Sequence, residues 1–244
     1  MRVRAKFHKF SGAGFTLVET VIAVGIVATL LVTILGILGL STETLRETIG
    51  AREADRLVTT LERELSILRE SEIDPDTRSA FDKAYQWIDK SSRGNAVKVL
   101  LYNFEGDPNT SGDDGNPKPI GSAGEGSGDV ILTSVARFIE DSTLPEEIKE
   151  ELGAVVGPVF FVRTTQLVYR NGALTRGDPG IIPPHEGQAP LTGGTTPADS
   201  YPEAVIAFEA DFYLLPSNTE DYIAGFTFED LGRPLFTRTM AVRR

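Results

Sequence analysis

The sequence predicts an α+β protein in which a long N-terminal helix, one half apolar and the other amphipathic, packs along an antiparallel β-sheet. Thr20–Leu40 contains no charged residue, and leucines recur at helical spacing from Leu45 to Leu68. Later runs rich in Val, Ile, Phe and Tyr are typical of strands. A long helix followed by several strands favours the α+β class.

The apolar half of this helix is long enough to cross a lipid bilayer. The 21 residues of Thr20–Leu40 would span roughly 31 Å as a helix, which matches the hydrocarbon core of a bilayer. The segment in front of it, Met1–Gly14, carries four basic residues and no acid. Basic residues before a membrane helix and an acidic region after it predict a cytoplasmic N-terminus and an exported C-terminal region.

One acid, Glu19, lies at the start of the apolar segment. A charged side chain costs about 2.5–3.5 kcal/mol at the centre of a bilayer and less near its edge. Glu19 is therefore a candidate functional residue.

The residues around Glu19 form a recognisable pattern. Gly14, Phe15, Thr16 and Leu17 precede the long apolar run, so the order is basic segment, glycine, apolar helix. A secretory signal peptide has its small-residue cleavage site after the apolar region instead. The arrangement resembles the leader of type IV prepilins and type II secretion pseudopilins, whose hallmark is a glycine, an apolar residue and Thr-Leu-x-Glu.

This resemblance, which covers about residues 1–45, implies the processing and the partners of the chain. A prepilin peptidase would cleave between Gly14 and Phe15 and methylate the new amino terminus of Phe15. Glu19 would pair with the Phe15 amine of a neighbouring subunit. The implied partners are the peptidase, other pilin or pseudopilin subunits, an inner-membrane assembly platform and membrane lipid.

The same resemblance implies a pilin-like fold and a structural, non-enzymatic role. The chain would first be a single-pass inner-membrane protein with a periplasmic head, and would then join a type IV pilus or a type II secretion pseudopilus, with the cell surface as a further location. The large head and its two long loops favour a minor or specialised subunit. The competing interpretation is an uncleaved signal anchor that tethers a non-polymerising binding module, but such an anchor gives no reason for Glu19.

Four regions follow from this interpretation: a leader (1–14), a transmembrane or filament-core helix (15–40), an amphipathic helix (41–74) and a globular head (75–244). We expect one helix from about Phe15 to about Glu72, stopped by Asp74-Pro75. Its buried stripe comprises Leu45, Ile49, Leu57, Leu61 and Leu65, and the charged residues between them, including Glu62, Arg63 and Glu64, form a solvated face. The drift of this stripe argues against a coiled coil.

The head is expected to contain short helices, strands and two long loops. Trp87, with Phe81 and Tyr85, is interpreted as core, with a ligand-stacking face as the alternative. Val130–Phe138 fits either a strand or a helix. The other predicted elements are helices at 77–89 and 144–152, strands at 96–104, 159–169, 204–215 and 235–242, and loops at 105–129 and 177–202.

Composition excludes several kinds of chemistry. The chain has no cysteine, so disulfides, thiolate metal sites and cysteine catalysis are impossible. Without the leader, 20 basic side chains face 35 acidic ones, which disfavours nonspecific nucleic-acid binding. His185 is the one histidine after the leader, and no catalytic motif accompanies it. We expect no enzyme activity and no cofactor.

The loop at 105–129 contains a weak candidate for a calcium site. Asp107, Asn109 and Ser111 alternate before Gly112, as oxygen ligands do in the first half of a calcium-binding loop. Position twelve is Lys118, where such a loop has a bidentate glutamate. A solvated acidic loop is the favoured interpretation. The glycine-rich stretch 121–128 lacks the Gly-Lys-Ser/Thr ending of a phosphate-binding loop.

Overall fold

The computed structural model describes residues 16–73, 76–91, 94, 97–112, 114–120, 129–140, 143–170, 172–182 and 198–244, without the side chains of residues 37–52, 54 and 71. The chain forms two compact units, Met1–Glu47 and Thr48–Arg244.

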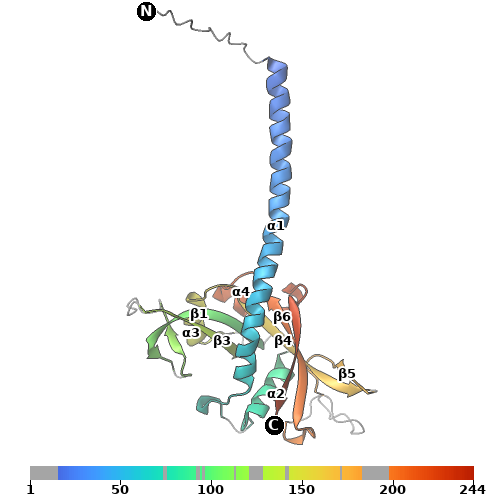
Figure 1. Cartoon of the computed structure of the whole chain (residues 1–244). Helices are drawn as coiled ribbons and strands as arrows, with labels where there is room; N and C mark the ends of the chain where they lie inside the picture. Colours follow the sequence, from blue (N-terminus) through green and yellow to red (C-terminus); the bar gives the residue numbers. More distant parts are fainter. Residues whose placement is uncertain are drawn as a thin grey trace, which may run out of the picture. The chain divides into compact units, whose positions relative to one another are not determined.

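The described part of the N-terminal unit is helical. Helix α1 (Leu17–Leu65) begins in this unit (Figure 1). Its first part, Leu17–Gly36, has 20 residues with a mean hydropathy of 2.4, and none of the most apolar window is buried. By length and composition this stretch can cross a membrane, a property that it shares with signal sequences. The predicted apolar helix is confirmed from Leu17 onward.

Helix α1 ends at Leu65, so the prediction that it continues to about Glu72 is wrong. The amide of Ile67 donates to the carbonyl of Glu64, three residues back, at 3.4 Å. The carbonyl of Ile67 in turn accepts a bond from Lys83 Nζ at 3.1 Å. A bond to the third residue back, in place of the fourth, tightens the last turn of a helix and often ends it. The Lys83 amine then takes the place of the backbone amide that would bond to the Ile67 carbonyl if the helix continued.

The C-terminal unit is built on one antiparallel sheet. Its strands run in the order β2-β1-β4-β6-β7, with β3 paired to β1 and β5 paired to β4. The strands are β1 (Lys98–Ser111), β2 (Pro117–Pro119), β3 (Ile131–Ile139), β4 (Phe160–Arg170), β5 (Ala173–Arg176), β6 (Val205–Leu214) and β7 (Phe236–Arg243). The helices after α1 are η1 (Glu70–Glu72), α2 (Ala80–Lys90), α3 (Glu146–Gly153), η2 (Ala198–Ser200), α4 (Glu220–Gly225) and η3 (Phe228–Asp230).

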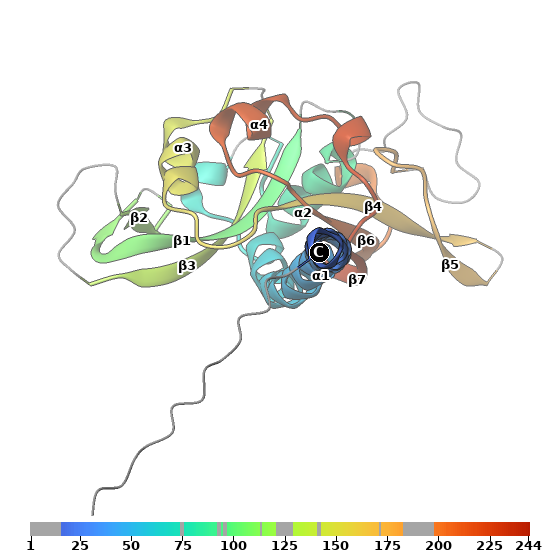
Figure 2. The same ribbon diagram turned by 90° about the horizontal axis from the view of Figure 1, so that it is seen from above.

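Helices cover both faces of this sheet (Figures 1 and 2). One face packs against the last turns of α1 and against α2, where Leu57, Leu61 and Trp87 are buried among strand residues. The other face packs against α3 and α4 through residues such as Ile148 and Ile223. Alternate residues of β1 contribute to the two cores, as expected for a strand that is covered on both sides. The core interpretation of Trp87 is confirmed.

Several predicted elements need correction. The prediction of a loop at 105–129 is wrong for residues 105–111, because β1 continues to Ser111 and pairs with β2. Gly115, at a φ of 78°, lies in the turn that joins them, where a left-handed conformation favours glycine. The ambiguous segment 130–138 is a strand, β3. Strand β5 and helix α4 were not predicted, and most of the loop at 177–202 lies outside the described residues.

Candidate functional site

Glu19 lies in the first turn of α1 and bonds to Thr16. The amide and hydroxyl of Thr16 donate to the Glu19 carboxylate at 3.4 and 3.3 Å. The amide of Glu19 donates back to the Thr16 hydroxyl at 3.3 Å. This reciprocal arrangement is a capping box, which satisfies amides that have no partner at a helix start. Glu19 therefore has a local structural role at the start of α1.

The surface that follows Glu19 is apolar and exposed. Large hydrophobic side chains from Leu17 to Leu35 are between 51% and 80% exposed. The hydroxyls of Thr29 and Thr33 bond at 2.9 Å to carbonyls four residues back, on Gly25 and Thr29. The two hydroxyls therefore have hydrogen-bond partners within the helix itself and do not need partners outside it. The length and composition of this apolar surface are compatible with a membrane span.

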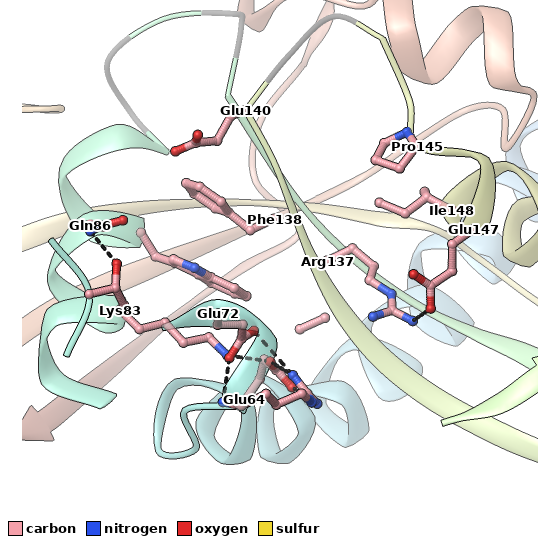
Figure 3. Close-up of a pocket in the computed structure, with 14 residues that line it drawn as sticks. Glu64, Glu72, Lys83, Gln86, Arg137, Phe138, Glu140, Pro145, Glu147 and Ile148 are labelled. Carbon is pink, nitrogen blue, oxygen red and sulfur yellow. Dashed lines mark hydrogen bonds and ion pairs between the residues drawn. The ribbon is translucent and has the colours of Figure 1, made fainter. Parts of the chain in front are cut away.

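A second candidate is a cleft of about 330 Å³ in the C-terminal unit (Figure 3). It lies between α2, β3, the start of α3 and the residues that follow α1. The lining residues are Glu64, Arg69, Glu72, Thr77, Lys83, Gln86, Trp87, Ala136, Arg137, Phe138, Glu140, Pro145, Glu147 and Ile148.

The charged groups at the base of this cleft bond to one another. Lys83 Nζ contacts Glu64 Oε1 at 2.6 Å and Glu72 Oε1 at 2.7 Å. Arg69 donates to both carboxylate oxygens of Glu64. Burial alone would raise the pKa of Glu64, but its bonds to Arg69 and Lys83 hold the pKa below its usual value. The sequence placed Glu64 on a solvated face, and this is wrong, because the residue is only 6% exposed.

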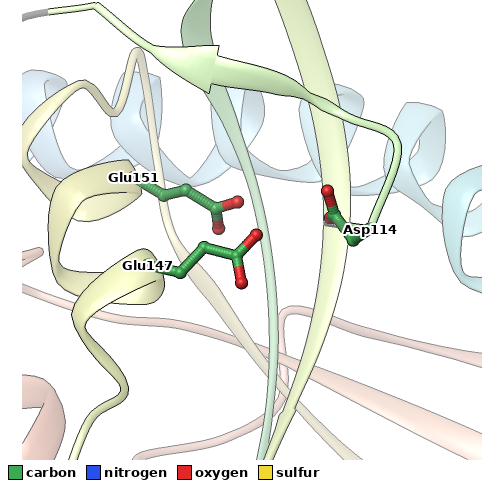
Figure 4. A group of neighbouring side chains, drawn as sticks. All are labelled: Asp114, Glu147 and Glu151. Carbon is green, nitrogen blue, oxygen red and sulfur yellow. The ribbon is translucent and has the colours of Figure 1, made fainter. Parts of the chain in front are cut away.

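A third candidate is a group of three carboxylates, Asp114, Glu147 and Glu151, whose oxygens lie within 4.8 Å of one another (Figure 4). Asp114 comes from the β1–β2 turn, and the two glutamates lie four residues apart on α3. Carboxylates at this separation can bind a divalent cation. The neighbouring side chain of Arg137 decides against such a site.

Arg137 already supplies the positive charge that this group needs. Its guanidinium pairs with Asp114 at 2.7 Å and with Glu147 at 3.9 Å, and it forms a two-point contact with Glu151. The Tyr102 hydroxyl donates to Glu151 at 2.5 Å. The group is therefore an ion-pair network that joins the β1–β2 turn, β3 and α3.

The pKa shifts in this network follow from burial and from these contacts. Burial opposes the charge of Arg137, but its bonds to Glu151 and the nearby carboxylates raise its pKa overall. Burial would also raise the pKa of Asp114, but the Asn116 amide and Arg137 together lower it. The pKa of Tyr102 lies well above its usual value, first because of burial and then because of the Glu151 charge.

The weak calcium candidate does not coincide with this group. Asp107, Asn109 and Ser111 lie on the outer part of β1. The Asp107 carboxylate accepts bonds from the backbone amide and side-chain amide of Asn109, at 2.9 and 3.2 Å, while Ser111 pairs in register with Pro117. A strand keeps these residues extended, whereas a calcium loop wraps its ligands around the ion.

The other residues that the sequence singled out lie outside the described residues. They are Gly14, Phe15, the stretch 121–128 and His185, together with the side chains of Leu45 and Ile49. The Arg137 network had no signal in the sequence beyond the spacing of Glu147 and Glu151, which places them on one helix face.

No family model, curated protein or solved structure matches the chain.

Proposed function

We propose that the chain is a structural subunit of a type IV pilus or a type II secretion pseudopilus, made as a precursor that a prepilin peptidase cleaves between Gly14 and Phe15. The observation that carries the proposal is a single acid, Glu19, at the start of an exposed apolar helix that is long enough to cross a bilayer. In the inner membrane this helix would contact lipid, and in the filament it would contact the helices of other subunits.

The fold of the C-terminal unit supports this proposal. In a pilin-like arrangement, the second half of the long helix packs on an antiparallel sheet. Here Leu57, Leu61 and Leu65 of α1 are buried in the core that includes strands β1, β4, β6 and β7. A head of this kind is consistent with a periplasmic location before assembly.

Glu19 is proposed to register each incoming subunit. In an apolar bundle a carboxylate gains most from an opposite charge, and cleavage after Gly14 would create an amine at Phe15. Within one chain the Thr16 amide already bonds to Glu19 at 3.4 Å, so the local geometry offers a weak contact. The Phe15 amine of a neighbour would offer an ion pair that offsets the desolvation of both charges.

The first test concerns processing. We expect the intact mass of the protein from its native membrane to correspond to a chain that begins at Phe15 and carries one methyl group. Gly14→Val should leave the precursor uncut. A full-length mass in cells with an active prepilin peptidase would refute the cleavage and would favour the uncleaved anchor.

The second test separates the assembly role of Glu19 from its capping role. Glu19→Ala should remain in the membrane and be cleaved, but its content in purified filaments should fall sharply. The matched control is Thr16→Val, which removes the hydroxyl of the capping box and keeps the carboxylate. Equal loss of filaments in both variants would assign Glu19 to capping alone, and wild-type filament levels with Glu19→Ala would exclude the pairing role.

A further inference from the structure

An exposed apolar patch lies at the beginning of strand β3 and is not explained by the fold. Val130, Ile131 and Leu132 are 51%, 41% and 46% exposed, and we name them the β3 patch. Successive strand residues point to opposite faces, so both faces of the strand are apolar here. Among the described strands, β3 pairs with β1 alone. An exposed apolar strand at a sheet edge is a surface that another chain can cover.

A second exposed apolar patch lies on the β4–β5 hairpin. Tyr169 and Leu174 are 64% and 57% exposed and are directly paired across the two strands, and we name them the β5 patch. Strand β6 pairs with β4 only as far as Gln166, so the hairpin extends beyond this pairing. The turn is closed by Gly172 at a φ of 83°, a conformation that favours glycine.

The two patches occupy opposite ends of the sheet. In Figure 2 the β1–β3 end lies at the left and β5 at the right. A contact between two different patches leaves each copy with one patch free for the next copy, so it generates a chain of subunits rather than a closed dimer. A filament subunit needs a contact of this type.

The charges that flank the patches are opposite in sign. Exposed Asp129 precedes the β3 patch, and exposed Glu105 is directly opposite Leu132 on β1. Exposed Arg170 lies between Tyr169 and the hairpin turn. If the two patches were in contact, the acids beside the β3 patch would face Arg170 beside the β5 patch. Charge complementarity of this kind favours one orientation and one partner.

We propose that the β3 patch of one copy of this chain binds the β5 patch of a second copy in the assembled filament. The inference rests on the proposed function, and it adds a contact between heads to the contact between apolar helices. The occupant is a second copy because the apolar and charged features of the two patches complement each other within one sequence.

The absence of native cysteine allows a direct test in filaments. The chain carrying Leu132→Cys and Leu174→Cys should give a ladder of covalent multimers when purified filaments are treated with a thiol-reactive crosslinker. The matched control carries Thr239→Cys and Leu174→Cys, because Thr239 is exposed on β7 and belongs to neither patch. The control should not give a ladder.

Charge substitutions provide a second measurement. Leu132→Asp and Leu174→Asp should each reduce filament yield by about tenfold, the scale of losing an interface anchor, while Thr239→Asp should leave it unchanged. All these variants alter exposed side chains, so the fold should persist.

The outcomes separate the inference from the proposed function. Filaments that contain the Leu132/Leu174 cysteine pair but give no ladder, or that give the same ladder with the control pair, overturn the head contact and leave the filament role intact. A correctly expressed wild-type chain that is neither cleaved nor incorporated into filaments overturns the proposed function and this inference together.

Discussion

Replacing Arg137 by Met tests whether the carboxylate group of the head depends on this guanidinium. Methionine retains most of the length of the side chain and removes the charge and the donors. Glu151, which is only 1% exposed, would keep the Tyr102 hydroxyl as a partner and lose its two-point contact with Arg137. The Asp114 contact at 2.7 Å would also be lost.

The expected loss of stability is large. Removing one partner of a buried ion pair costs about 3–5 kcal/mol, because the remaining charge is left without compensation. For a domain of this size, 1 kcal/mol corresponds to about 2–4 °C in melting temperature. The melting temperature of the head should therefore fall by about 6–20 °C. An exposed pair is worth only about 0.2–1 kcal/mol, so Arg238→Met, which breaks a half-exposed contact with Asp55, should have a small effect.

Tryptophan fluorescence of the full chain in detergent gives a suitable assay. Trp87 is the only tryptophan, is 6% exposed, and stacks on Phe138 with ring centroids 5.1 Å apart. Phe138 is adjacent to Arg137, so the probe reports on the same strand. Adding Glu151→Gln to Arg137→Met removes the buried charge and should restore part of the lost stability. If Arg137→Met lowers the melting temperature no more than Arg238→Met does, the carboxylate group does not depend on this guanidinium. A double variant that is no more stable than Arg137→Met would lead to the same conclusion.

Three further predictions concern solution conditions. The pKa of Glu64 in the folded chain lies below its usual 4.5. Its contribution to stability is therefore complete above pH 4.5 and is lost as the pH falls through the lower folded pKa. Glu64→Gln should flatten the acid side of a plot of melting temperature against pH, and an unchanged slope would contradict this. Melting curves with and without a thiol reductant should coincide, since the chain has no cysteine, and a difference would point to a redox-active group other than a disulfide. A calcium chelator should leave the melting temperature unchanged, whereas a shift of several degrees that Asp107→Ala abolishes would show that the acidic residues of β1 bind calcium.

The elements that the sequence predicts well depend on strong local patterns. The apolar helix was evident from a run without charge, and β4 and β6 from dense β-branched and aromatic residues. Helix α2 was placed by the spacing of its apolar residues, and the structure adds a local cap, the Ser79 hydroxyl, which accepts the Asp82 amide. In each case the information lies within the segment itself.

The elements that the sequence missed depend on distant partners. The outer half of β1 is polar and rich in turn-forming residues, so it was interpreted as a loop, and only its pairing with β2 and β3 makes it a strand. The end of α1 is likewise set by Lys83, which lies on another helix. Tertiary contacts of this kind override local propensity, and no periodicity reports them.

Glu64 and Glu19 show why a carboxylate in a helical pattern cannot be interpreted by its position alone. Both lie within α1. From the sequence, Glu19 was unusual because its neighbours are apolar, and Glu64 was ordinary because its neighbours are charged. Glu64 is buried because Arg69 and Lys83 come from outside the helix to bond to it. Glu19 bonds locally to Thr16 over distances of 3.3–3.4 Å, which leaves room for a stronger partner. A charge that is already paired contributes to the stability of its own chain, and a charge that is weakly paired on an apolar surface favours a contact with another. This difference is the reason for proposing that Glu64 and its neighbours stabilise the head, whereas Glu19 acts in the proposed assembly of the chain with other subunits.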